Sequence, residues 1–219
     1  MRRRNAADLA RLSLALALVA IALSAWVWKA GAPLPGDEWL LLRLQSSDAL
    51  HRNAGWVNGA GDIALIALVA TAIWIAIRPL LMRRRAIANR SEVLVSFAVA
   101  ALLGLLNPEL KLIVDSPRPA VALGIRVDGT FSGTGYPSGH VYGDVLAFGI
   151  LAVFASAYLP RWAVLPARAI FVAIILLSGA ARVSVGAHWP SDTAGGYLWG
   201  GAALCLALAA GRWSRTVKR

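Results

Sequence analysis

Long apolar stretches separated by short polar segments dominate the chain. Six of these stretches are long enough to cross the hydrocarbon core of a bilayer as helices, and they lie near residues 11–29, 59–77, 92–110, 139–159, 163–181 and 192–211. The fifth contains Arg168, whose side chain must reach toward the membrane surface. The pattern predicts an all-α, polytopic membrane protein with six transmembrane helices, organised as a single domain over residues 1–219.

The first apolar stretch has two interpretations. It follows a basic N-terminus and could be a signal peptide, with a possible cleavage site in "ALSA". Its uncharged part runs from Leu12 to Trp28, which is long for a signal, and Trp26 and Trp28 suit the membrane interface. These features favour an uncleaved transmembrane helix.

The segment that follows, roughly 31–58, is also open to two interpretations. Pro35-Gly36 breaks the chain, and Asp37 could cap a short helix through Leu50. Trp39 and the leucines after it would let such a helix lie on the membrane surface. An irregular loop with a few apolar anchors fits the same residues equally well.

Composition supports the membrane assignment. Hydrophobic residues make up 58% of the chain, charged residues 15%, and the mean hydropathy is +0.64. The net charge of +11 could indicate nucleic acid, but the basic residues lie between apolar stretches, which indicates membrane topology instead. The single Cys205 excludes an intrachain disulfide and makes a cysteine metal site implausible.

The basic residues also predict an orientation. Fifteen of the 22 fall on one side of the predicted membrane, in residues 2–11, 78–90, 161–168 and 212–219. Because positive charge collects on the cytoplasmic side, we expect both termini in the cytoplasm of a cell whose inner membrane holds the protein.

Three polar segments then meet at the opposite, extracytoplasmic face. They are "KLIVDSPRP" (Lys111–Pro119), "YPSGH" (Tyr136–His140) and "ARVSVGAHWPSD" (Ala181–Asp192). Guanidinium and ammonium groups neutralise phosphate charge, and backbone N–H groups at a helix start cradle an anion. A neutral histidine held by a carboxylate four residues later can act as a nucleophile, and a second histidine can protonate the leaving oxygen. The segments therefore indicate phosphoryl chemistry without a metal.

These motifs resemble those of the type 2 phosphatidic acid phosphatase superfamily, which includes bacterial undecaprenyl-diphosphate phosphatases and vanadium haloperoxidases. Lys-x6-Arg-Pro matches Lys111 to Pro119, Pro-Ser-Gly-His matches Pro137 to His140, and Ser-Arg-x5-His-x3-Asp matches Arg182 to Asp192, with Ala181 in place of the usual serine. The resemblance covers about residues 90–200, and "GAGD" at Gly59–Asp62 resembles the second helix of bacterial members.

The resemblance implies a role for each matched residue. His188 forms a phosphohistidine, Asp192 orients it and His140 is the acid; phosphate is bound by Lys111, Arg118, Ser138, Gly139 and Arg182. Asp144, one helical turn after His140, is either a tuning carboxylate for that histidine or a hydrated interface residue.

Taken alone, each of these residues could be an interfacial or capping residue, but three motifs in order favour catalysis. We expect a lipid phosphatase without metal or other cofactor, which meets its substrate in the bilayer and binds no nucleic acid. Undecaprenyl diphosphate is the first expectation for the substrate, ahead of phosphatidylglycerol phosphate and phosphatidic acid. A phosphotransferase remains open, a non-enzymatic scaffold is disfavoured by the intact motifs, and a haloperoxidase is disfavoured because those relatives are soluble.

Overall fold

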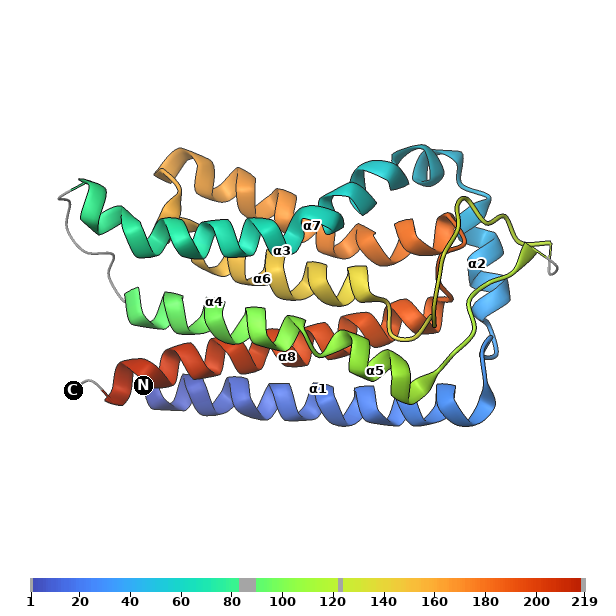
Figure 1. The fold of residues 1–219 in the computed structure, drawn as a ribbon, viewed down its shortest axis with the longest axis horizontal. Helices are drawn as coiled ribbons and strands as arrows, with labels where there is room; N and C mark the ends of the chain where they lie inside the picture. The colour runs from blue at the N-terminus through green and yellow to red at the C-terminus, as the bar shows by residue number, and fades with distance from the viewer. Residues whose placement is uncertain (1, 83–89, 122–123, 218–219) are drawn as a thin grey trace.

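The computed structural model describes residues 2–82, 90–121 and 124–217, and this part of the chain forms eight helices. They are α1 (Arg2–Ala30), α2 (Asp37–Gln45), α3 (Asp48–Met82), α4 (Arg90–Gly104), α5 (Asn107–Val114), α6 (Gly139–Tyr158), α7 (Arg161–Ser184) and α8 (Pro190–Val217), as Figure 1 shows. Described residues outside the helices form turns and extended connections, with no strand among them. The all-α expectation is confirmed.

The membrane-spanning expectation is supported by helix length and apolarity. Five helical segments in the described chain are long and apolar enough to cross a bilayer: Asn5–Ala30, Arg90–Val114, Gly139–Tyr158, Arg161–Ser184 and Pro190–Arg215. A sixth candidate is α3, whose two halves, Asp48–Ala64 and Ile66–Ile77, meet at an angle of 45°. The chain is thus a helical multi-pass membrane protein.

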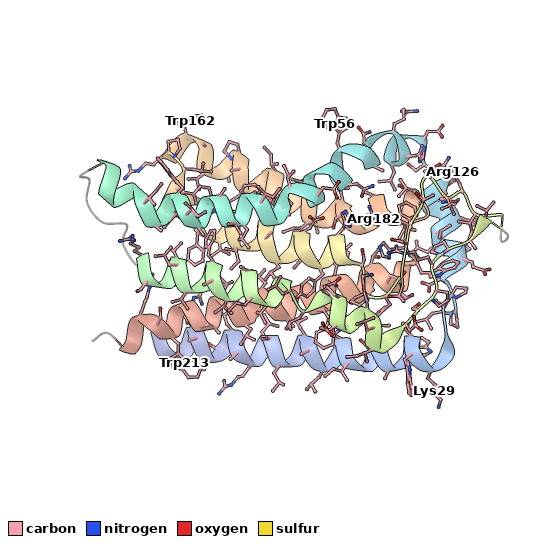
Figure 2. All side chains as sticks on the ribbon, in the orientation of Figure 1. Lys29, Trp56, Arg126, Trp162, Arg182 and Trp213 are labelled. Atoms are coloured by element: carbon pink, nitrogen blue, oxygen red, sulfur yellow. The ribbon has the colours of Figure 1, made fainter. Side chains whose placement is uncertain are left out.

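The helices form a bundle with both termini at one end (Figure 1). Helices α1 and α8 lie side by side, and α8 also contacts α4 and α6. At the other end, α2 and the connection from α5 to α6 cover the bundle (Figure 1). Lys29 and Arg126 lie at this covered end, and Trp213 lies at the end that holds the termini (Figure 2).

Helix α6 is the centre of the bundle. Its buried side chains, including Phe148, Ile150 and Leu151, pack with residues of α3, α4 and α8 in one apolar cluster. The glycines of α8 permit close packing against α6. A Cβ on Gly196 would lie 2.8 Å from the backbone oxygen of Ser138, and one on Gly200 would lie 2.9 Å from that of Tyr142. Because Gly196 and Gly200 have no side chain, the first turns of α6 and α8 can pack closely against each other.

Two local expectations were wrong in detail. The short helix after the first span ends at Gln45 instead of Leu50, and Asp37 does not cap it. Its buried carboxylate accepts hydrogen bonds from the backbone N–H of Leu34 (2.8 Å) and from Ser191 in α8. Asp37 therefore bonds to a residue 154 positions later in the chain and does not cap its own helix.

The third span is broken by a turn after Gly104, so that it comprises α4 and α5. Pro108 lies in the first turn of α5, where its missing N–H leaves no helical hydrogen bond unmade. Arg168 of α7 donates from Nε to the backbone oxygen of Ala152 (2.9 Å), so its charge meets a carbonyl of α6.

Candidate active site

The three polar segments converge at the end of the bundle that is opposite the termini. Lys111 lies in the last turn of α5, Ser138 immediately precedes α6, and His188 lies in the turn between α7 and α8. Arg182 lies between the helices near this end (Figure 2). The backbone N–H of Ser138 donates to the backbone oxygen of Asp192 (2.9 Å), which fixes the second segment against the third.

His188 is held by Asp192 in the first turn of α8. The distance between His188 Nδ1 and Asp192 Oδ2 is 3.2 Å, and the same oxygen accepts the backbone N–H of Trp189 at 3.0 Å. Both side chains are almost completely buried, with 2% and 0% of their surface exposed. Gly135 leaves room for the carboxylate, because a Cβ there would lie 2.6 Å from Oδ2. The carboxylate therefore fixes the imidazole with its Nδ1 proton toward Asp192.

The other ring nitrogen of His188 faces Arg118. Arg118 Nη1 lies 3.1 Å from His188 Nε2, and the same group donates to the backbone oxygen of Ala187 at 2.6 Å. A guanidinium has no acceptor and stays protonated, so Nε2 must present its lone pair. The hydrogen bonds at the two nitrogens together fit a neutral imidazole with its proton on Nδ1 and its lone pair on Nε2.

The electrostatic surroundings favour the same protonation state. Burial lowers the pKa of His188 well below its usual value, and the positive charges of Arg118 and Lys111 lower this pKa further. Burial is also the main cause that lowers the pKa of Arg118. A neutral His188 next to permanent cations is what attack on a phosphate group requires.

The cations are positioned by backbone oxygens and by an aromatic ring. Lys111 Nζ donates to the backbone oxygens of Thr134 (2.9 Å) and Gly135 (3.1 Å). The guanidinium carbons of Arg118 and Arg182 lie 5.9 Å and 5.6 Å from the centroid of the Phe131 ring. This ring holds two like charges near one another through cation–π attraction, a role for Phe131 that the sequence did not suggest.

Several buried polar atoms near the cations have no partner among the described residues. They include Nε of Arg182 and Oγ of Ser138, in residues that are 8% and 0% exposed. Buried donors are rarely left without an acceptor in proteins. Ser138 immediately precedes α6, where helix N–H groups also point outward, and Arg182 lies in the last turn of α7. Unpartnered donors of this kind suit an oxyanion with several acceptor atoms.

His140, in the first turn of α6, has a carboxylate partner from α3. The distance between His140 Nε2 and Asp62 Oδ1 is 2.7 Å. Asp144 is buried and lies close to His140. A Cβ on Gly61 would lie 3.0 Å from His140 Cδ2 and 3.1 Å from Asp144 Oδ1, so both side chains face the same point on α3. The hydrogen-bonding role thus falls to Asp62, and a tuning effect of Asp144 stays a prediction.

A cavity of about 330 Å³ lies next to His140 between α3, α4 and α6. Its lining is polar near Asp62, His140 and Asn107, and apolar farther in; the apolar residues include Leu68, Ala100 and Leu146. Asn107 was not predicted as a site residue. It is 8% exposed, and its Nδ2 has no partner among the described residues, so it is a donor at the cavity wall.

Asp37 was also missed as a residue that supports the site. Its carboxylate accepts the Ser191 backbone N–H at 2.8 Å and the Ser191 hydroxyl at 2.6 Å. These bonds anchor the start of α8 one residue before Asp192, and so they help to place the His188–Asp192 pair. No pattern in the sequence connects α2 with α8.

Helices of membrane-spanning length, with cations, two histidines and a buried aspartate gathered at one end, define a membrane protein suited to anion chemistry. A sequence profile of the PAP2 superfamily matches residues 91–215, which is more than half of the chain. The chain belongs to this superfamily and is a phosphatase, and the resemblance inferred from the motifs is confirmed.

A solved structure shows the same fold. The crystal structure of a transmembrane PAP2-type phosphatidylglycerolphosphate phosphatase from Bacillus subtilis superimposes with a TM-score of 0.69. The two sequences are 21% identical, and the alignment covers 94% of this chain and 98% of that one. A search among curated proteins found no match.

Proposed function

We propose that the protein is a lipid phosphatase that works through a phosphohistidine on His188 and needs no metal. The observation that carries this proposal is the state of His188: its Nδ1 proton is held by Asp192, and its Nε2 lone pair faces Arg118. A phosphate bound by the cations would bring its phosphorus to this lone pair.

The proposed reaction has two steps. In the first, Nε2 of His188 attacks phosphorus, an N–P bond forms, and the bond from phosphorus to the leaving oxygen breaks as His140 gives that oxygen a proton. In the second, water attacks phosphorus, His140 takes a proton from the water, and the N–P bond breaks to release phosphate. Lys111, Arg118 and Arg182 stabilise the charge on the phosphoryl oxygens, together with the Ser138 hydroxyl and the Gly139 backbone N–H.

The cavity next to His140 supports a lipid leaving group. The leaving oxygen must lie within reach of the acid, so the rest of the leaving group lies on the His140 side of the phosphate. There the lining changes from Asp62 and Asn107 to apolar side chains of the membrane-spanning helices. A lipid chain fits this change of polarity, whereas a soluble polar group does not.

We propose undecaprenyl diphosphate as the physiological substrate. Three cations suit the charge of a diphosphate, which exceeds that of a monoester at neutral pH. Phosphatidylglycerol phosphate is the second candidate, because the superimposed Bacillus subtilis protein is described as a phosphatase of that lipid. Phosphatidic acid and transfer of the phosphoryl group to an acceptor other than water are further alternatives.

We expect purified protein to release phosphate from undecaprenyl diphosphate at least as efficiently as from the two glycerolipids, in buffer that contains EDTA. The physical reason is that side-chain cations, which a chelator does not remove, neutralise the substrate charge. The measurement is kcat/KM for phosphate release from each lipid in detergent micelles. A clear preference for a glycerolipid would reassign the substrate, and activity only with added magnesium would contradict the metal-independent mechanism.

We also propose that the site faces away from the cytoplasm of a cell whose inner membrane holds the protein. A cysteine at exposed Thr130, in the loop before α6, is expected to react with a membrane-impermeant maleimide in intact cells once Cys205 is replaced by alanine. A cysteine at Ala7, exposed at the opposite end of the bundle, is the matched control and should be protected until the membrane is opened. The reverse pattern of labelling would overturn the orientation.

A further inference from the structure

The hydrogen bond from His140 to α3 involves a residue, Asp62, that lies outside the three signature motifs. Asp62 lies 78 residues before His140, and the distance of 2.7 Å between its Oδ1 and His140 Nε2 is that of a charge-assisted hydrogen bond. The adjacent ring atom, Cδ2, also faces α3, since it would lie 3.0 Å from a Cβ on Gly61. One edge of the imidazole is therefore turned toward α3, which leaves Nδ1 on the other edge.

We propose that Asp62 is the positioning residue for the acid of the reaction. It engages the Nε2 proton of His140, so that Nδ1 carries the proton delivered to the leaving oxygen. This assignment rests on the proposed function, because it presumes that His140 is the acid. Asp62 would then do for His140 what Asp192 does for His188, and each histidine of the site would have its own carboxylate.

The proton balance of the first step follows from this arrangement. The imidazolium form of His140 holds one proton on each nitrogen. As the bond between phosphorus and the leaving oxygen breaks, the Nδ1 proton passes to that oxygen, and neutral His140 keeps its Nε2 proton in the bond to Asp62. In the second step Nδ1 accepts a proton from the attacking water, which restores the imidazolium.

Cationic side chains at the site favour a carboxylate partner for the imidazolium form of His140. Arg182 of α7 and Arg118 of the loop after α5 bring two positive charges to the site, and both guanidinium groups lie over the Phe131 ring. Asp62 of α3 is the direct opposing group, and Asp144 lies farther along α6 on the same side. The Asp62 side chain is 67% exposed, so we attribute its effect to the direction of the hydrogen bond more than to long-range attraction.

The test compares Asp62→Asn with the wild type on two lipid-soluble phosphate monoesters. An alkyl phosphate has a leaving oxygen that needs a proton, whereas a 4-nitrophenyl phosphate releases a stable phenolate. We expect kcat/KM to fall about 10- to 100-fold for the alkyl ester, part of the roughly 10²- to 10⁴-fold that general acid catalysis contributes, and by less than about 3-fold for the aryl ester. The alkaline limb of kcat/KM for the alkyl ester should also move to lower pH.

Two further variants separate positioning from structure. Asp62→Glu keeps a carboxylate and should recover most of the alkyl-ester activity. Asp48→Asn removes an exposed carboxylate at the start of the same helix and should leave kcat/KM unchanged for both esters. Equal losses on both esters, or no loss on either, would overturn the role of Asp62. A wild-type protein inactive on both esters would instead count against the proposed function itself.

Discussion

Replacing His188 with alanine is expected to lower the rate of phosphate release by at least about 10⁴-fold, a loss of the size seen when other enzymes lose a nucleophile. The reason is geometric as well as chemical. His188 Nε2 is placed by bonds at both ring nitrogens, to Asp192 and to Arg118, and no described side chain next to it could replace it as nucleophile. The measurement is single-turnover phosphate release from a radiolabelled lipid phosphate.

A matched variant separates chemistry from folding. His188 is 1% exposed, so alanine leaves a cavity and removes a hydrogen bond from Asp192. Asparagine at position 188 can place its amide N–H where Nδ1–H lies and has no nucleophilic nitrogen, so His188→Asn should purify like the wild type and still be inactive. Wild-type protein quenched in acid-free denaturant should carry label on His188, and substantial turnover by either variant would contradict the assignment.

The helices and the gathering of the motif residues at one end of the bundle could be predicted from sequence for related reasons. Apolar runs of membrane-spanning length leave little choice of structure, because backbone polar groups must be satisfied within each helix. The motif residues lie at helix ends, such as Lys111 at the end of α5 and His140 at the start of α6, so the order of spans brought them to one face. Gly196 and Gly200 then let α8 approach α6 closely.

The partners of these residues could not be predicted in the same way. Asp37 reaches Ser191 over 154 positions, and Asp62 reaches His140 over 78, which no local spacing encodes. His51 is a third case, because its Nδ1 lies 3.5 Å from Oδ2 of Asp128 in the loop before α6. Such pairs depend on how helices turn against one another, and helical periodicity alone does not specify that.

The bend in α3 was also not predicted, and it lies close to the site. The sequence predicted a span near 59–77, but the helix begins at Asp48 and its two halves meet at 45°. Gly61 and Asp62 lie close to this bend, where α3 passes His140. In the "GAGD" segment, Gly61 is explained by the close approach of the His140 ring.

Among substitutions in the site that preserve side-chain size, we expect Asp192→Asn to lower kcat the most. Oδ2 of Asp192 accepts from both His188 Nδ1 and the Trp189 backbone N–H. An asparagine with its oxygen in the position of Oδ2 can still accept both hydrogen bonds, but it has no negative charge to stabilise the imidazolium that forms as Nε2 bonds to phosphorus. One with its N–H₂ in that position forces Nδ1 to accept. In the second case the proton moves to Nε2, and His188 loses the lone pair that attacks phosphorus.

We therefore expect Asp192→Asn to lower kcat by roughly 10³- to 10⁴-fold, as the equivalent change does in a Ser-His-Asp triad through the wrong tautomer. Substrate affinity should change little, because the cations that we propose bind phosphate, Lys111, Arg118 and Arg182, are retained. The measurement is single-turnover kinetics together with the Kd of the lipid substrate in the inactive His188→Asn background, with and without Asp192→Asn. Glu38→Gln, which makes the same change from carboxylate to amide at an exposed residue of α2, is the control and should retain most of the activity. If kcat were unchanged in Asp192→Asn, Asp192 would hold only the fold of the turn, and His188 would need no carboxylate to react.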